Sequence, residues 1–352
     1  MKRRAFLFSL GALAMLPVAA HAHQDQDGIA DGRADWHAWK DGFLAADGRV
    51  IDHLQDEASH SEGQGYALVL SVFHGDRAAF DLIRNWTDAN LAKRADGLLN
   101  WRLDKGATQP RPENATDGDI FYAWGLCLGG QRFDLPEALD RSRHLAKAIA
   151  DTCLKPDPRD STRLVVLPAA EGFLRGTMVT LNPSYIMPRA LRDLALLTHD
   201  TRLAKAADDG EDLLREIAET GLAPDWIEID IAGLRPSTLH KPQSGYDALR
   251  VPLYLIWSGR AMHPAVEKAR RMLGAHAEGD MPVVTDLGGQ IVSVSSTYAG
   301  YASLRALILR EDPLHAPLKF PRLDTAQGYY PATLDMLSRV AAAETGSALI
   351  SD

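Results

Sequence analysis

The sequence predicts an all-α fold in which helical hairpins close into a ring. Segments that are apolar on every side alternate along the chain with amphipathic segments, and short connections alternate with long ones. A helix that is apolar all round is buried, whereas an amphipathic helix covers a core with one face. The alternation therefore predicts an inner ring of helices surrounded by an outer ring.

Eleven segments show helical patterning and take these two roles in turn. We expect the apolar segments to form the inner ring; they span residues 65–73, 119–128, 183–197, 246–257 and 298–309. We expect the amphipathic segments outside them; they span residues 35–43, 76–91, 136–153, 202–220, 265–276 and 332–343. Eleven segments, or twelve if one is missed, fit six inner and six outer helices, and their irregular spacing does not indicate a solenoid.

The connections indicate where function lies. Those from an inner to an outer segment are short, as at residues 73–76 and 197–202, and the return connections are long. Long loops in a compact domain usually carry function, and here they all lead into the N-terminal ends of inner helices, at one end of the ring. We expect short strands in them, for example at residues 98–103 and 164–167, and one domain over residues 23–352.

Residues 1–22 have the pattern of a secretory signal peptide. A basic start precedes an apolar run and a small-x-small cleavage site at Ala20-His21-Ala22. Arg3-Arg4 also fits a twin-arginine export signal, so the export route stays open. An uncleaved membrane anchor is the alternative, but the apolar run is short for a membrane span and Pro17 interrupts it. We expect the mature protein to be periplasmic or secreted.

Charge and composition limit the partners. The chain has 38 Lys and Arg against 47 Asp and Glu, a net charge of −9. This balance disfavours nucleic acid, because binding to it depends on neutralising phosphates. The 12 histidines show no metal-binding spacing near the acidic motifs, so we expect neither a metal nor a cofactor.

The two cysteines are not expected to form a disulfide. Cys127 and Cys153 fall at opposite ends of successive helices. A helix of about 18 residues is roughly 27 Å long, and a disulfide needs Cα atoms within about 7 Å of each other.

Three acidic motifs lie at the starts of apolar segments. They contain Glu62, Asp117 together with Asp119, and Asp247. Capping-box spacing around Glu62 and Asp119 offers a purely structural alternative, in which the acids only close a helix start. In the predicted ring, however, all three motifs converge on the end that carries the long connections. Aromatic residues accompany them in the sequence: Tyr66, Trp101, Tyr185, Trp226, Tyr246, Tyr329 and Tyr330.

Acids combined with aromatic rings are typical of enzymes that cleave glycosidic bonds. Hydrolysis of a glycosidic bond uses one carboxylic acid and one carboxylate on either side of the bond. Aromatic rings provide flat apolar surfaces on which sugar rings stack.

The motifs resemble those of glycoside hydrolase family 8. Ala115-Thr116-Asp117-Gly118-Asp119 is similar to the family signature, although Tyr122 stands where Ile or Met is usual. Residues 61–66 resemble its general-acid motif and residues 245–250 its general-base motif, and residues 182–185, 224–226 and 329–330 also match. The resemblance runs from about residue 36 to residue 343. It is nearest to the periplasmic endoglucanases that are encoded with bacterial cellulose synthases.

The resemblance implies an (α/α)6 barrel that hydrolyses β-1,4-glucan with inversion of configuration. It implies Glu62 as the general acid, Asp247 as the general base and Asp117 as a ligand of the sugar at the cleavage point. We expect the remaining substrate-site residues to be Arg250, Tyr246, Trp101, Tyr185, Tyr329 and Tyr330. Arg250 would orient Asp247, Tyr246 would position water or sugar, and the other aromatic rings would stack on sugars.

The sequence also allows other substrates and functions. The same fold could act on xylan, mixed-linkage glucan or chitosan. A different class of function is a non-catalytic glucan-binding partner of a cellulose export complex, and an association with cellulose synthase is possible in either case. We assign Asp119 mainly to structure. A general acid must keep its proton near neutral pH, and Asp117 is the neighbouring charge expected to help Glu62 do so.

Overall fold

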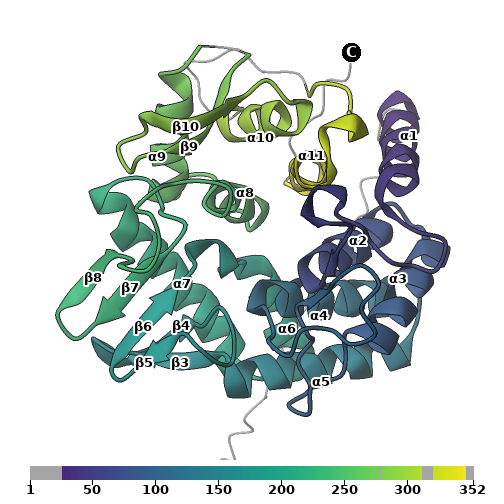
Figure 1. Ribbon diagram of the computed structural model, residues 1–352, viewed down its shortest axis with the longest axis horizontal. Coiled ribbons are helices and arrows are strands. Elements are labelled where there is room, and N and C mark those ends of the chain that lie inside the picture. Colours follow the sequence, from purple (N-terminus) through teal and green to yellow (C-terminus); the bar gives the residue numbers. More distant parts are fainter. Residues whose placement is uncertain (1–25, 278, 311–319, 346–352) are drawn as a thin grey trace, which may run out of the picture.

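The computed structural model describes residues 26–277, 279–310 and 320–345, so the predicted signal peptide lies outside the described residues. Eleven α-helices and ten short strands make up the regular structure of the described part. The chain runs round a ring in order, from α1 and α2 in purple, through teal α6, to α11 in yellow (Figure 1). The all-α prediction is confirmed.

An inner ring of helices closes on itself. Each inner helix packs against the next, and the last, α11, packs against α2. The members are α2 (Ser61–Phe73), α4 (Thr116–Arg132), α6 (Pro188–Thr198), α8 (Arg250–Trp257), α10 (Ala299–Leu309) and α11 (Tyr329–Glu344). α2, α4, α8 and α10 are buried almost along their whole length, as helices without a polar face must be.

The outer helices cover this ring. They are α1 (Gln26–Phe43) on α11, α3 (Arg77–Asn90) on α2, α5 (Pro136–Thr152) on α4, α7 (Thr201–Thr220) on α6 and α9 (Pro264–Gly274) on α8. Their starts follow local sequence rules. The Asp76 carboxylate accepts a hydrogen bond from Ala79 N at 3.0 Å and caps α3. Pro136 opens α5, where its missing N–H is not needed.

Helix α11 corrects one expectation. Residues 332–343 were expected to form a one-faced outer helix, but α11 is buried on nearly all sides and belongs to the inner ring. Two of its polar residues find partners inside the protein. Thr333 Oγ1 accepts a hydrogen bond from Trp39 Nε1 at 3.1 Å, and Asp335 pairs with Arg339 at 2.6 Å. The polar residues of this segment made it look amphipathic in the sequence, although in the structure they are buried or half-buried.

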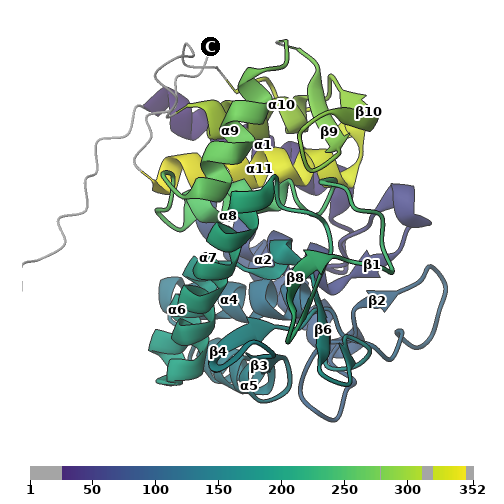
Figure 2. The same cartoon turned by 90° about the vertical axis from the view of Figure 1, so that its left-hand side faces the viewer.

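The strands lie in the long connections, as predicted, and all of them pair antiparallel. Three are two-stranded sheets: β1 (Ser59–His60) with β2 (Arg102–Leu103), β3 (Leu154–Asp157) with β4 (Asp160–Val166), and β9 (Met281–Thr285) with β10 (Ile291–Ser296). The fourth sheet runs in order through β5 (Leu174–Arg175), β6 (Met178–Leu181), β7 (Ile227–Asp230) and β8 (Gly233–Pro236). In Figure 2, β1, β2 and β10 lie on the same side of the molecule.

Three 3-10 turns complete the elements: η1 (His53–Gln55), η2 (Pro183–Tyr185) and η3 (Thr325–Gln327). Residues 183–185 were expected to belong to an inner helix, but they form η2, and α6 begins only at Pro188. Both cysteines are buried and free, which confirms the prediction of no disulfide. Within the ranges that the structure describes, no helix has both the length and the apolar character needed to cross a membrane.

Candidate active site

The buried guanidinium of Arg250 gathers three acids from three parts of the chain. Arg250 opens α8 and is 2% exposed. Its Nη1 binds the Glu62 carboxylate and lies 3.5 Å from Asp117, and its Nη2 binds Asp247 at 2.6 Å. A buried cation requires such partners, because an unpaired one is strongly destabilising. The structure thus brings together the three acids that the sequence singled out.

The same guanidinium has two neutral partners. Nη1 donates to the Tyr66 hydroxyl at 3.0 Å, and Nη2 donates to Ser184 Oγ at 2.9 Å. Tyr66 comes from α2 and Ser184 from η2, so the contacts of Arg250 tie α2, α4, α8 and η2 together. Its orientation is fixed by bonds to side chains rather than by solvent.

Solvent reaches the acids unequally. The side chain of Glu62 is 20% exposed and that of Asp247 is 33% exposed, whereas Asp117 lies buried between them and the protein interior. A substrate can therefore touch Glu62 and Asp247 without any opening of the fold. Arg250 stands between these two carboxylates and holds each by a different nitrogen.

Glu62 and Asp117 meet because the first turns of α2 and α4 touch. A Cβ atom on Gly118 would lie 2.7 Å from the backbone nitrogen of Glu62, and one on Gly65 would lie 2.9 Å from the backbone nitrogen of Tyr122. Only glycine permits this approach. Glycines that weaken an isolated helix are therefore the means by which two acid-bearing helix starts come into contact.

The capping boxes that offered a structural alternative do not form. α2 begins at Ser61, and its cap is His60, whose Nδ1 accepts a hydrogen bond from Gly63 N at 3.0 Å. The N-cap residue of α4, Ala115, makes no side-chain cap bond, and the Asp119 carboxylate accepts instead from Leu99 N at 2.7 Å and Asn114 Nδ2 at 2.9 Å. These bonds tie the connection before α4 to the helix. The structural assignment of Asp119 fits this geometry.

Asp247 lies in a turn three residues before α8, and Asp225 holds that turn. The Asp225 carboxylate accepts hydrogen bonds from Gly245 N at 2.9 Å and Ala248 N at 3.0 Å, the residues on either side of Tyr246 and Asp247. It also accepts from Gln243 Nε2 at 3.1 Å. The sequence flagged residues 224–226 without a role for them. The structure gives Asp225 that role: it fixes the turn that presents Asp247.

Burial in the cluster favours the protonated form of Asp117. Burial raises the pKa of Asp117 to about 8, with a further increase from the charge of Glu62, while Arg250 opposes the rise. Burial also raises the pKa of Asp247; Arg250 opposes this, and the charges of Asp225 and Glu62 add to it. Near neutral pH the free protein therefore holds a proton on Asp117, within reach of the same Arg250 nitrogen that binds Glu62.

Two tyrosines lie next to the acids. The half-buried hydroxyl of Tyr185 has a raised pKa, because it is desolvated and close to Asp117 and Asp247. Tyr246 adjoins Asp247 and is exposed, and its backbone oxygen accepts a hydrogen bond from the Tyr330 hydroxyl. The rings of Tyr246 and Tyr330 meet edge to face with centroids 6.2 Å apart.

Trp101 and Tyr329 stand in different surroundings. Trp101 is half-buried beside the start of α2, where its backbone oxygen accepts from Ser61 N at 2.8 Å, and the guanidiniums of Arg102 and Arg111 lie against its ring. Tyr329 is 1% exposed and packs edge-on against Phe43 and His60. Its expected role as a stacking platform is therefore wrong, since a buried ring has no face to offer a sugar.

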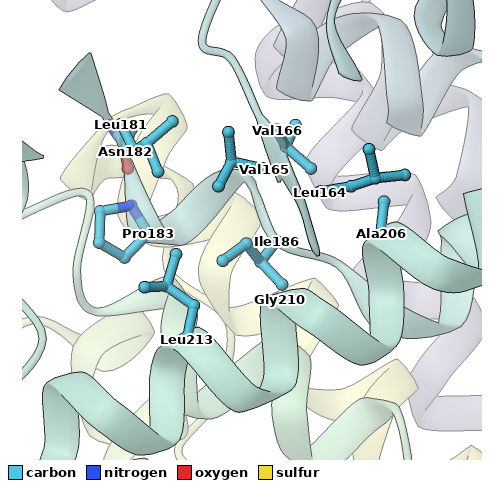
Figure 3. A pocket seen from close by; sticks show the side chains of 10 residues that line it. All are labelled: Leu164, Val165, Val166, Leu181, Asn182, Pro183, Ile186, Ala206, Gly210 and Leu213. Carbon is cyan, nitrogen blue, oxygen red and sulfur yellow. The ribbon is translucent and has the colours of Figure 1, made fainter. Parts of the chain in front are cut away.

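Sequence reasoning missed the role of Asn182. Its Oδ1 accepts a hydrogen bond from Ser184 N at 3.0 Å and so fixes η2. Its buried amide group opposes the rise that burial causes in the pKa of Asp247. Behind Asn182 lies a pocket walled by apolar side chains such as Leu164, Ile186 and Leu213 (Figure 3). No acid lines this pocket, so it is separate from the carboxylate cluster.

Clusters of carboxylates can also bind metal ions. Among the residues that the structure describes, no three His, Cys, Asp or Glu side chains are arranged to hold a metal ion. The carboxylates of the cluster are occupied with Arg250 instead.

Two partly exposed carboxyls held by different nitrogens of one guanidinium fit an enzyme that cleaves glycosidic bonds with one acid and one base. The chain matches the family model of glycosyl hydrolases family 8 over residues 4–343 and belongs to that family. It is thus a glycoside hydrolase with an (α/α)6 fold.

Individual relatives extend this finding. The chain is 30% identical over 341 residues to a probable endoglucanase of Novacetimonas hansenii, covering 95% of this chain and 96% of that protein. The crystal structure of endoglucanase Cel10 of Klebsiella pneumoniae superimposes with a TM-score of 0.81 at 29% identity, over 88% of this chain and 99% of that one. The endo-β-1,4-glucanase CMCax of Acetobacter xylinum gives a TM-score of 0.80 at 30% identity, over 90% and 99% of the two chains.

Proposed function

We propose that the protein is an inverting endo-β-1,4-glucanase that cleaves internal bonds of cellulose or soluble β-glucan. The observation that carries the proposal is the meeting of Glu62, Asp117 and Asp247 at the guanidinium of Arg250. The names of the relatives support glucan as the polymer. The mature chain, residues 23–352, acts as one catalytic domain.

In this mechanism the two exposed carboxyls act on opposite sides of the bond. Asp247 takes a proton from a water molecule as its oxygen attacks the anomeric carbon. Glu62 gives its proton to the glycosidic oxygen, so the bond breaks and the leaving sugar departs as an alcohol. The new C–O bond forms on the face opposite the broken one, and a β-linkage yields an α-anomer. Solvent then restores the proton of Glu62 and removes that of Asp247.

Asp117 and Arg250 prepare the reaction. Asp117 holds a proton in the free protein beside Glu62. It passes this proton to Glu62 before the glycosidic oxygen is protonated, and its carboxylate then accepts a hydrogen bond from the sugar at the cleavage point. Arg250 fixes the carboxylate of Asp247 at 2.6 Å and keeps it aimed at the attacking water. Tyr185, Tyr246 and Tyr330 bind the sugars around the bond, and Trp101 binds one beyond them, at the edge of α2.

Export and partnership complete the proposal. Residues 1–22 direct the chain out of the cytoplasm, and the mature enzyme works in the periplasm or outside the cell. There it trims β-1,4-glucan in support of bacterial cellulose synthesis, near the cellulose synthase complex. No cofactor takes part.

The decisive experiment measures which polymer is cut and which anomer appears. Wild type is expected to release reducing ends from carboxymethyl-cellulose with a rapid fall in viscosity, and proton NMR of early products should show the α-anomer first. Asp247→Asn should abolish both signals. Faster release from xylan, mixed-linkage glucan or chitosan would assign one of those polymers instead. A wild type with no hydrolysis but tight glucan binding would favour the non-catalytic alternative.

A further inference from the structure

Two stacked tyrosines stand at the start of α10. The rings of Tyr298 and Tyr301 are nearly parallel, 10° apart, with centroids separated by 6.4 Å. Tyr301 is buried, whereas Tyr298 is 46% exposed. One face of Tyr298 is thus backed by a fixed ring, and the other side is turned towards solvent.

The position of this pair is set by the barrel. Tyr298 is the N-cap residue of α10. Inner helices begin at the end of the ring where α2, α4 and α8 carry Glu62, Asp117 and Arg250. Two backbone bonds fix it there, from its own N to Ser296 Oγ at 3.2 Å and from Ala302 N to its oxygen at 3.0 Å. Tyr298 therefore lies at the active-site end.

Two further tyrosines lie at the same end of the ring. Tyr246 adjoins Asp247, in the turn that leads into α8, and its ring meets that of Tyr330 with centroids 6.2 Å apart. The hydroxyls of Tyr246 and Tyr298 both add to the increase that burial causes in the pKa of Tyr301. Tyr298 therefore stands at the end of the ring that carries Tyr246 and Asp247.

Two tryptophans at this end already have neighbours against their rings. Trp226 is sandwiched between Phe173 at 5.7 Å and His240 at 4.4 Å, both nearly parallel to it. Trp101 has two guanidiniums against its ring. For Tyr298, Tyr301 is the only ring or cationic neighbour found among the described residues. A backed ring with one open face is the form of a stacking platform for a sugar.

We propose that Tyr298, supported by Tyr301, binds a glucosyl unit remote from the scissile bond and thereby favours long chains over short ones. The inference rests on the proposed glucanase function. It names a subsite on the side of Asp247, where the sequence offered Tyr246 and Tyr330 but not Tyr298. Short oligosaccharides that fill only the central positions never reach this ring.

The test compares kcat/KM on cello-oligosaccharides of increasing length, from cellotriose to cellohexaose. Tyr298→Ala should lower kcat/KM on the long members by about two- to tenfold, which is the worth of one aromatic stacking contact, and leave the shortest cleaved member unchanged. Tyr298→Phe should retain the preference of wild type, because the ring remains. Leu196→Ala is the matched control, an exposed apolar side chain near the C-terminal end of α6.

The outcomes are distinct. The subsite is overturned if Tyr298→Ala, with an unchanged melting temperature, lowers kcat/KM equally on every chain length. It is also overturned if kcat/KM on the long oligosaccharides does not fall. A wild type that cleaves no cello-oligosaccharide at all overturns the proposed function, and the subsite with it, before any variant is made.

Discussion

The two sides of the active site are built by different means. Glu62 stands on the first turn of α2, where it is positioned by backbone contact with α4 through Gly65 and Gly118. Asp247 stands in an irregular turn before α8, where hydrogen bonds to the Asp225 carboxylate hold the backbone. The position of Glu62, the proposed general acid, depends on close packing, whereas that of Asp247, the proposed general base, depends on polar contacts and charge.

This difference predicts different sensitivities. Packed helix starts do not tolerate added volume, because neighbouring backbone cannot move aside. A turn held by a carboxylate tolerates changes of volume better than changes of charge. The carboxylates of Glu62 and Asp247 both bind the guanidinium of Arg250, so a displacement of either one changes the contacts of Arg250.

The largest effect should come from the two carboxyls themselves, where the two sides should be equally essential. Glu62→Gln and Asp247→Asn should each lower kcat by about 10²–10⁴-fold, the usual contribution of a general acid or base. Circular dichroism should show both variants folded. If either variant keeps activity within about tenfold of wild type, the residue concerned is not the acid or base.

The next largest effect should come from Gly118→Ala on the packed side. The new Cβ would lie 2.7 Å from the backbone of Glu62, which must shift. We expect kcat to fall by about 10²-fold, because small displacements of a catalytic group are costly. The melting temperature should also fall, with a loss of about 1–3 kcal/mol of stability.

Gly32→Ala is the control for this variant. In α1 its nearest neighbour would be His74 Cε1 at 4.0 Å, so the change should leave activity intact and raise stability slightly. If Gly118→Ala and Gly32→Ala have equal effects on kcat and melting temperature, close packing does not explain how Glu62 is positioned.

Asp117→Asn should have an intermediate effect on rate, about tenfold, together with a change in pH dependence. Folded Asp117 holds its proton up to a pKa of about 8, whereas in the unfolded chain it ionises near 3.8. Since the folded state binds this proton more tightly, wild type loses stability as the pH rises from about 4 to about 8. Asparagine cannot ionise, so the variant should lose less stability than wild type over the same pH range.

Thermal unfolding near pH 5 and near pH 8 measures this difference, and Asp212→Asn on the exposed side of α7 is the control. The alkaline limb of the pH–rate profile should move as well, because the charge of Glu62 and the proton on Asp117 influence each other. An alkaline limb that stays in place would contradict this influence.

The smallest effect is expected from Asp225→Asn on the polar side. The amide oxygen can still accept from Gly245 N and Ala248 N, so kcat should fall only a few-fold, about the effect of one weakened hydrogen bond. The charge is lost, however, and that charge adds to the effect of burial in raising the pKa of Asp247. The acidic limb of the pH–rate profile should therefore move to lower pH.

Gln243→Ala removes a neutral contact of the same carboxylate and should leave the acidic limb where it is. If both variants leave it unmoved, Asp225 acts on the turn through its backbone bonds alone.

Much of the site could be predicted because the acids follow the helical pattern. Glu62, Asp117 and Asp247 each mark the start of an inner helix, and a ring brings such starts together. The pattern could not separate Asp117 from Asp119, two acids on one turn that are both buried with raised pKa values, about 8 and about 7. Only their partners differ: Asp117 faces Arg250, and Asp119 faces Asn114 and Leu99.

Other features depend on contacts between residues far apart in sequence. Tyr329 and Tyr330 are neighbours in the chain, yet one ring is buried against Phe43 and the other meets Tyr246. Asp225 supports the proposed base only because the segment just before β7 lies beside residues 243–248, which lead into α8. The sequence marks these residues as unusual but does not say what they touch.

By itself, then, the alternation of apolar and amphipathic segments determined the ring, the end that carries the chemistry and the three acids at that end. Periodicity records which residues avoid water, and burial of apolar surface is the main force that builds the barrel. Tertiary structure alone decided the place of α11, the caps of α2 and α4, and the state of each acid. Hydrogen bonds and pKa values depend on which groups come within a few ångströms of one another, and that proximity exists only once the chain has folded.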